Sequence, residues 1–212
     1  DVRSSAMRLG ESIGLNMLET FQKPVRLADL EKCLKDVKGS EPEITSESLV
    51  AALVAGELEL FYQPQIRLHG GRTGEVCGME GLMRWRQAQN KVIPPDKFIP
   101  LAEESDLIVA LTDLAVTQAA KQGALWHQQG LEISVAVNLS PVLLRDRGLP
   151  EHLQSLIASG GLEPKRLVLE VTESGTMANA VLAREILTRL RIHGMQISLD
   201  DFGTGFSSFV QL

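Results

Sequence analysis

The sequence predicts a globular α/β protein with a mostly parallel sheet, and three observations support this prediction. From residue 45 onward, short apolar segments with the two-residue alternation of strands take turns with longer segments of helical apolar spacing. Hydrophobic residues make up 44% of the 212 residues and charged residues 23%, as in soluble globular proteins. No apolar run approaches the roughly 20 residues that cross a bilayer, so we expect no membrane insertion. Alternating strands and helices favour parallel pairing, because a helix returns the chain to the same end of the sheet.

The elements can be assigned in order along the chain. Thr45 is the expected N-cap of the first helix, and Glu47 lies in its first turn, where a carboxylate stabilises the positive end of the helix. Pro64 falls within the first strand and favours an edge or a bulge, because proline donates no backbone hydrogen bond. The expected strands are residues 58–68, 76–85, 133–139, 166–172 and 196–199. The expected helical regions are residues 45–53, 95–129, 151–158 and 178–193.

Residues 1–37 are too few to bury a core of their own and are expected to end a larger domain, followed by a linker over residues 38–44. Residues 14–21 are predicted as a strand and residues 27–37 as an amphipathic helix, with Lys23-Pro24 between them. This order resembles the end of a response-regulator receiver domain. A generic strand, turn and helix, in which the proline ends the strand, is the alternative. The resemblance implies control by a sensor histidine kinase, although the phosphorylated aspartate and its acidic pocket are absent from this chain.

Four successive strands each carry an oxygen-bearing side chain near the carboxyl end. Because strand side chains alternate between two faces, each of these residues shares a face with small or apolar neighbours. Oxygen ligands favour Mg²⁺, Mn²⁺ or Ca²⁺ over zinc, and no histidine or cysteine joins the set. In parallel α/β barrels the reactive groups gather at this end of the strands. The four residues are Glu80, Asn138, Glu170 and Asp200.

Ordinary structural roles are open to some of these residues. Glu80 could pair with Arg84, and Asn138 could cap the turn at Ser140. Glu170 is harder to explain in this way, because it interrupts an apolar strand and buried carboxylates are rare unless they are paired or bind metal. Four coincidences at equivalent strand positions favour a shared metal site.

The adjacent carboxylates of Asp200 and Asp201 precede a glycine-punctuated loop. Alone, this segment is equally consistent with an acidic turn, since aspartate and glycine are common in turns. Two neighbouring carboxylates repel each other, and a divalent cation is the usual compensation. The strand-face pattern favours the cation.

Six motifs in order resemble the front part of an EAL domain, the family of cyclic di-GMP phosphodiesterases. The family signature Glu-Ala-Leu-x-Arg-Trp is matched by residues 80–85, with Gly81 in place of alanine. The other matches are Tyr62-Gln63-Pro64, Pro95 with Phe98 to Glu103 and Asp106, Val137 to Ser140, Glu170 to Ser174, and Asp200 to Gly205.

The resemblance implies a modified (β/α)8 barrel of the TIM type with an antiparallel first strand, of which the first five strands are present in this chain. It implies a bacterial signalling enzyme that hydrolyses cyclic di-GMP to linear pGpG with two Mg²⁺ or Mn²⁺ ions. It further implies a homodimer formed through the EAL domain.

Residue roles follow from the same resemblance. Glu80, Asn138 and Glu170 would hold one metal, Asp200 would bridge the two ions, and Asp201 would help to hold the second. Glu173 would hold the loop after Asp201 in place, so the expected catalytic residues are Glu80, Glu173, Asp200 and Asp201. The expected substrate contacts are Gln63, Leu82 and Arg84.

The EAL domain, expected over residues 45–212, would be incomplete at its C-terminal end. The family's lysine at the end of the sixth strand and a later glutamate are not among these residues. We therefore expect either an excerpt of a longer polypeptide or a truncated product. A receptor that binds cyclic di-GMP without cleaving it, and a receiver-driven regulatory scaffold, are the alternative functions.

The net charge, the cysteines and the N-terminal sequence limit the partners and the compartment that we expect. The net charge of −6 argues against binding to a nucleic-acid polymer. Cys33 and Cys77 suggest neither a disulfide framework nor a thiolate metal site. With no signal-peptide pattern at the N-terminus, we expect a cytoplasmic protein.

Overall fold

The computed structural model describes residues 21, 25–29, 44–68, 72–87, 91–172 and 180–200. The chain divides into two units, Asp1–Glu43 and Ile44–Leu212. In the first unit, residues 27–29 are helical, and Arg26 Nε donates to Asp29 Oδ2 over 2.9 Å. The expected Lys23-Pro24 pair lies outside the described residues, as do most of the expected strand and helix around it.

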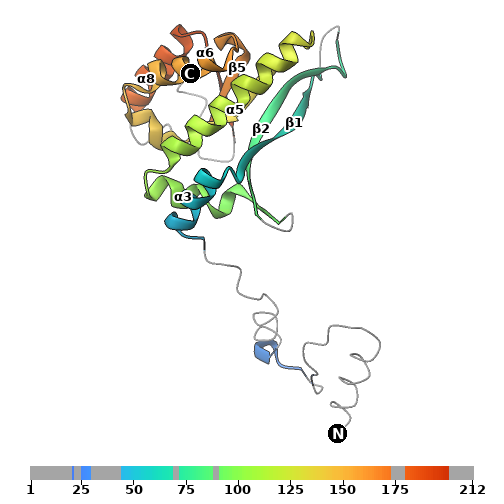
Figure 1. Ribbon diagram of the computed structural model, residues 1–212, viewed down its shortest axis with the longest axis vertical. Helices are drawn as coiled ribbons and strands as arrows, with labels where there is room; N and C mark the ends of the chain where they lie inside the picture. Colours follow the sequence, from blue (N-terminus) through green and yellow to red (C-terminus); the bar gives the residue numbers. More distant parts are fainter. Residues whose placement is uncertain are drawn as a thin grey trace. The chain divides into compact units, whose positions relative to one another are not determined.

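The second unit is built on a sheet that has six strands in its described part. The antiparallel pair β1 (Leu58–Ile66) and β2 (Val76–Arg86) begins it (Figure 1). The strands β4 (Ser134–Asn138), β5 (Leu167–Thr172) and β6 (Gln196–Asp200) add in parallel. The strand order is β1-β2-β4-β5-β6, and the short β3 (Val92–Ile93) pairs with the end of β2. The five expected strands are confirmed, with ends shifted by one or two residues. β3 was not expected, because two residues are too short to show an alternation.

Helices follow the strands as expected, with one correction. The helical region expected over residues 95–129 is not continuous, because Asp106 adopts a left-handed φ of 58° that separates two helices. A 3-10 turn, η2 (Pro95–Lys97), precedes them. None of the described helices is both long and apolar enough to cross a membrane. The α-helices are α3 (Ser46–Ala55), α4 (Ile99–Glu104), α5 (Ile108–Gln128), α6 (Leu149–Gly160) and α8 (Ala180–Ile192).

The N-cap expected for the first helix is confirmed. The Thr45 hydroxyl accepts a hydrogen bond from the Ser48 backbone N–H over 3.2 Å, and Ser48 Oγ accepts one from the Thr45 N–H over 2.9 Å. This reciprocal pair satisfies two backbone donors that the helix itself leaves without partners. It fixes the start of α3 at Ser46, one residue after the cap.

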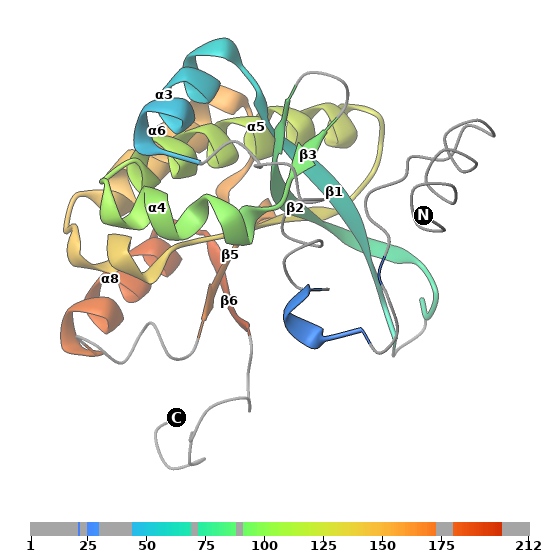
Figure 2. The ribbon, with the colours of Figure 1, turned by 90° about the horizontal axis from the view of Figure 1, so that it is seen from below.

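The sheet has an apolar face and a polar face. Side chains on one face are buried against the helices, which lie together on that side of the sheet (Figure 2). Trp85 there meets Phe98 edge to face, with ring centroids 6.0 Å apart. Buried residues that alternate along the strands form this core: Leu58, Leu60, Met83, Trp85, Val135, Val137, Leu167, Leu169 and Val171. The residues between them therefore point to the opposite face, which carries the polar side chains.

Helix α5 is joined to β1 through the side chain of Gln118. Its Oε1 accepts a hydrogen bond from the Leu60 N–H over 2.8 Å, and its Nε2 donates to the Leu58 carbonyl over 3.1 Å. The Tyr62 hydroxyl donates to the Gln118 backbone carbonyl over 3.4 Å, and burial raises the pKa of Tyr62 to about 12. These contacts hold the edge strand β1 against the helix layer.

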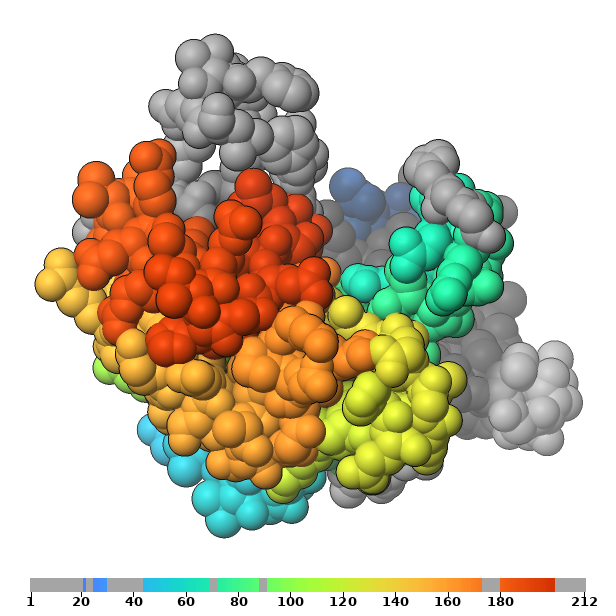
Figure 3. All heavy atoms as spheres, turned by 90° about the horizontal axis from the view of Figure 1, so that it is seen from above, coloured from blue at the N-terminus to red at the C-terminus, as the bar shows by residue number. Residues whose placement is uncertain are grey.

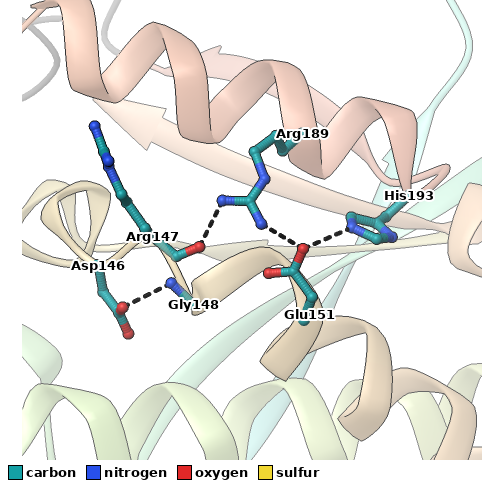
Figure 4. A network of polar contacts seen from close by, with 6 residues as sticks. All are labelled: Asp146, Arg147, Gly148, Glu151, Arg189 and His193. Carbon is teal, nitrogen blue, oxygen red and sulfur yellow. Dashed lines mark hydrogen bonds and ion pairs between the residues drawn. The ribbon is translucent and has the colours of Figure 1, made fainter.

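Helices α6 and α8, which flank β5 in sequence, are linked by a surface network. The two helices lie against each other in the space-filling view (Figure 3). Arg189 of α8 donates from Nη1 to the Arg147 carbonyl over 2.6 Å and from Nη2 to the Glu151 carboxylate (Figure 4). His193 Nε2 lies 3.3 Å from the same Glu151 oxygen. The helix-terminal backbone N–H of Glu151 and the Arg189 side chain lower the pKa of Glu151, so this carboxylate stays ionised.

Helices α5 and α6 pack closely against each other at Gly160. A Cβ atom on Gly160 would lie 2.5 Å from the Cβ of Ala120 and 3.1 Å from the Ala120 backbone carbon. Such distances require one helix to move, since backbone atoms cannot turn aside. The absence of a side chain at Gly160 therefore sets the separation of the two helices.

We predict that Gly160→Ala lowers the free energy of unfolding by about 1–3 kcal/mol, as expected for overpacking in a core. Urea denaturation of the wild type and the variant measures the difference. Gly148→Ala is the matched control, because Gly148 has φ −81° and its new Cβ would approach only the movable Asp146 carboxylate, at 3.3 Å. Equal stability of the two variants would contradict the prediction.

Candidate active site

The strand register brings the expected oxygen ligands onto the polar face of the sheet. Asn138 of β4 lies directly beside Glu170 of β5, and Thr172 of β5 lies beside Asp200 of β6. Glu80 of β2 is aligned with Ala136, two positions before Asn138 on the same face. The alternation thus correctly predicts a shared face for all four, but the expected position near the carboxyl end holds for Asn138, Glu170 and Asp200 only. Glu80 lies in the middle of β2, because that strand continues for six residues to Arg86, beyond its pairing with β4. We call this face, with Glu80, Asn138, Glu170 and Asp200, the acidic face.

The carboxylates on the acidic face are close enough to influence one another. Partial burial raises the pKa of Glu170, and the negative charges of Glu80 and Asp200 raise it further. A hydrogen bond from Gln65 opposes this rise. Like charges that repel across a partly buried site are the arrangement that a bound cation stabilises.

The donor set fits a hard divalent cation in its chemistry, because it consists of carboxylate and amide oxygens. In the part of the chain that the structure describes, no three Asp, Glu, His or Cys side chains are close enough to enclose an ion. Asp201 and Glu173, the other expected catalytic residues, lie outside the described residues. The described side chains thus present the ligands on one face without enclosing an ion.

The alternative structural roles weighed for Glu80 and Asn138 are not observed. Among the described residues no ion pair joins Glu80 to Arg84, whose Nη1 donates to the Met83 carbonyl over 2.9 Å instead. The turn after β4 is capped by Ser140, whose hydroxyl accepts from the Val142 N–H over 3.3 Å. The Asn138 side chain is left exposed on the acidic face.

The three expected substrate contacts surround Glu80 on the same face. Gln63 of β1 lies directly opposite Glu80 and is exposed, and Leu82 and Arg84 follow Glu80 at two-residue steps along β2. This placement puts Gln63 and Arg84 on the same face of the sheet as the carboxylates. A guanidinium near an acidic metal site is suited to a phosphate oxygen.

A cavity of about 550 Å³ opens beside Leu82. It lies between the middle of β2 and the ends of β4 and β5 on one side, and α4 with the first half of α5 on the other. Its lining is mostly apolar, with Leu82, Asn138 and Glu170 among its wall residues. Ligand cavities in enzymes have this size and this mixture of apolar walls and few polar groups.

Sequence reasoning assigned no role to a contact that supports the end of β4. Ser140 Oγ donates to Glu103 Oε1 of α4 over 2.6 Å, a charge-assisted bond that ties the residue two positions after Asn138 to the helix layer. Both residues belong to family motifs, yet their contact joins positions 37 residues apart. Gln65, which bonds Glu170, was likewise missed, although it shares the two-residue spacing of Gln63.

Comparison with known proteins identifies the family. The family model of the EAL domain matches residues 46–212. The chain belongs to the EAL domain family. MucR of Pseudomonas aeruginosa, a bifunctional diguanylate cyclase/cyclic di-GMP phosphodiesterase, is 39% identical over 162 residues, which cover 76% of this chain and 23% of MucR. The cyclic di-GMP phosphodiesterase RocR of the same organism is 30% identical over 221 aligned positions, which cover 100% of this chain and 56% of RocR.

The solved structures agree with this assignment. The structure of the PaMucR phosphodiesterase in complex with c-di-GMP matches with a TM-score of 0.70 and 39% identity, covering 76% of this chain and 65% of that one. The EAL domains of the comparison are TIM-barrel-like, so the expected α/β fold class is confirmed. This EAL chain spans a quarter to just over half of the length of the MucR and RocR proteins.

The raised pKa of Glu170 predicts how stability of the metal-free protein depends on pH. The folded protein holds the Glu170 proton to a higher pH than the unfolded chain does, so the free energy of unfolding falls as the pH rises through the raised pKa. Glutamine at position 170 does not ionise, so Glu170→Gln removes this fall in the free energy of unfolding. In EDTA at pH 7.5, we expect the variant to melt about 2 °C above the wild type, and the difference to disappear near pH 4.

Differential scanning calorimetry at the two pH values measures the effect. Glu104→Gln is the control, because Glu104 is exposed on α4, away from the acidic face. A melting temperature for Glu170→Gln below that of the wild type at pH 7.5 would show that repulsion at this site does not limit stability.

Proposed function

We propose that this chain is the catalytic domain of a bacterial phosphodiesterase that hydrolyses cyclic di-GMP to linear pGpG. The observation that carries the proposal is the convergence of Glu80, Asn138, Glu170 and Asp200 on one face of neighbouring strands, next to a cavity that Asn138 and Glu170 line. RocR, named as a cyclic di-GMP phosphodiesterase, aligns over the whole chain and supports this substrate. In the reaction, a water oxygen bonds to phosphorus, the bond to the 3′ oxygen breaks, and that oxygen takes a proton.

The cofactors of this reaction are two Mg²⁺ or Mn²⁺ ions, which when bound lower the pKa of water and neutralise phosphate charge. Glu80, Asn138 and Glu170 would hold one ion, Asp200 would bridge both, and Asp201 would contribute to the second. The mutual repulsion that raises the pKa of Glu170 supports a cation at this place.

The remaining roles concern binding and support. Arg84 would bind a phosphate oxygen of cyclic di-GMP, Gln63 would donate an amide hydrogen bond to the substrate, and Leu82 would pack against it at the cavity wall. Glu173 would hold the loop that follows Asp201. The apolar wall of the cavity excludes water from one side of the ligand and so strengthens these polar contacts.

The organisation of the chain is part of the proposal. Residues 1–37 would be the end of a receiver domain, residues 38–44 a linker and residues 45–212 the EAL domain. The alignment with RocR covers residues 1–43, beyond the reach of the family match, and supports a related segment there. A cytoplasmic setting, a sensor histidine kinase as partner and a homodimer through the EAL domain complete this picture.

The proposal predicts that Asp200→Asn and Glu80→Gln each lower the rate of pGpG release by about 100-fold or more. Even residues that only support a metal ligand change affinity or activity by about 10–100-fold, and ligands themselves are expected to matter more. Chromatographic separation of cyclic di-GMP and pGpG, with Mg²⁺ or Mn²⁺ present and the intact protein as enzyme, measures the rates. Glu104→Gln on the exposed side of α4 should match the wild type.

Two outcomes would replace the proposal. Binding of cyclic di-GMP without any pGpG from the wild type would favour a receptor. A partner that binds only after phosphorylation, with no effect of the nucleotide, would favour a regulatory scaffold.

A further inference from the structure

Gly78 leaves a space on the acidic face that the side chain of Gln65 fills. Gly78 is buried in β2, two residues before Glu80, and pairs directly with Gln65 of the antiparallel β1. A Cβ atom on Gly78 would lie 2.6 Å from Gln65 Oε1, which is closer than two such atoms approach in proteins. The Gln65 side chain therefore lies across the backbone of Gly78, and any side chain there would displace it.

Lying across Gly78, the Gln65 amide reaches a strand that does not pair with its own. Its Nε2 donates to Glu170 Oε1 over 3.5 Å, although β2 and β4 lie between β1 and β5 in the sheet. Glu170 follows Gln65 by 105 residues. Across this face, the amide is a neutral donor to a carboxylate that otherwise faces the negative charges of Glu80 and Asp200.

An amide is well suited to orient a metal ligand. It holds one carboxylate oxygen by a hydrogen bond and adds no charge that would compete with a cation, and the second oxygen stays available. Arginine or lysine at the same place would compete for the carboxylate and would repel a cation, and so would oppose ion binding. Partners of this kind typically change metal affinity or activity by about 10–100-fold when they are removed.

We propose that Gln65 is a positioning residue for the Glu170 carboxylate, and that Gly78 lacks a side chain in order to let the Gln65 amide reach it. The role rests on the proposed metal-dependent function of the acidic face. Gln65 acts through Glu170 and makes no contact with substrate in this role, which separates it from its neighbour Gln63. The pair Gln65 and Gly78 would thus set the affinity of the site for its ion.

The test is a titration of the intact protein with Mn²⁺ alone, in which the electron paramagnetic resonance signal of free Mn²⁺ reports binding without any turnover. Gln65→Met keeps the volume of the side chain and removes the donor, so we expect the Kd for Mn²⁺ to rise by about 10-fold or more. At saturating Mn²⁺, kcat should return toward the wild-type value and KM for cyclic di-GMP should stay unchanged. Gln128→Met, at the exposed end of α5, is the matched control and should bind Mn²⁺ as the wild type does.

A double-mutant cycle tests the role of the glycine. Gly78→Ala in the wild type should weaken Mn²⁺ binding by displacing the amide, whereas the same change made in Gln65→Ala should add no further loss. Because the new Cβ also lies 3.3 Å from the Ser134 carbonyl oxygen, the melting temperatures of all four proteins are measured to separate misfolding from lost affinity.

The outcomes are distinct. If the wild type binds Mn²⁺ and Gln65→Met binds it equally well, or if Gly78→Ala weakens binding in both backgrounds alike, the positioning role is overturned and the proposed function stands. If the wild type binds no Mn²⁺, the metal dependence in the proposed function fails, and the role of Gln65 fails with it.

Discussion

The alternation of side chains along the strands is the constraint on which both the core and the acidic face depend. In β4 and β5, valine and leucine at alternate positions are buried under the helices, and the residues between them must face the other way. A shift of one residue in any pairing would exchange the two sets and bury Asn138 or Glu170 under α5. The apolar packing of Val137 and Leu169 therefore also fixes where the ligands lie. The same strand register is therefore required for a stable core and for the placement of the acidic face.

The like charges of the acidic face make an electrostatic contribution that opposes folding. Glu80, Glu170 and Asp200 repel one another on a partly desolvated surface, and only the amide of Gln65 among their described contacts favours the ionised form of Glu170. If these positions served only the stability of the fold, neutral side chains would be favoured over three carboxylates. Three carboxylates at this place are the arrangement expected of a site shaped by its ligand rather than by folding.

Local patterns in the sequence predicted the elements and faces well, and distant contacts poorly. The strand assignments, the Thr45 cap and the common face of Glu80, Asn138, Glu170 and Asp200 follow from local spacing, because they depend on residues within a few positions. The break at Asp106 depends on a single backbone angle, and β3 depends on pairing with the end of β2, so neither leaves a periodic trace. The contact of Glu103 with Ser140 joins separate elements and exists only in the folded chain, so no local pattern predicts it.

The expected substrate contacts show the same contrast between local positions, which the sequence predicts, and distant contacts, which it does not. Gln63, Leu82 and Arg84 could be placed on the face of Glu80 by counting in twos, and the structure has them there. Gln65 obeys the same count, yet its significance depends on Gly78 across the hairpin and on Glu170 three strands away. The sequence alone does not indicate that the glycine at position 78 makes room for a side chain from another strand.

The Gln118 side chain has a consequence for how the sheet can grow. Its amide occupies the outward backbone groups of Leu58 and Leu60, so at this end of β1 a side chain performs the pairing that another strand would perform. Exposed strand edges recruit strands from other molecules and promote aggregation, and proteins commonly block them. Any strand that adds to β1 must therefore begin beyond Leu60 or displace the amide. One glutamine on α5 thus restricts the register in which the edge of this sheet can be extended.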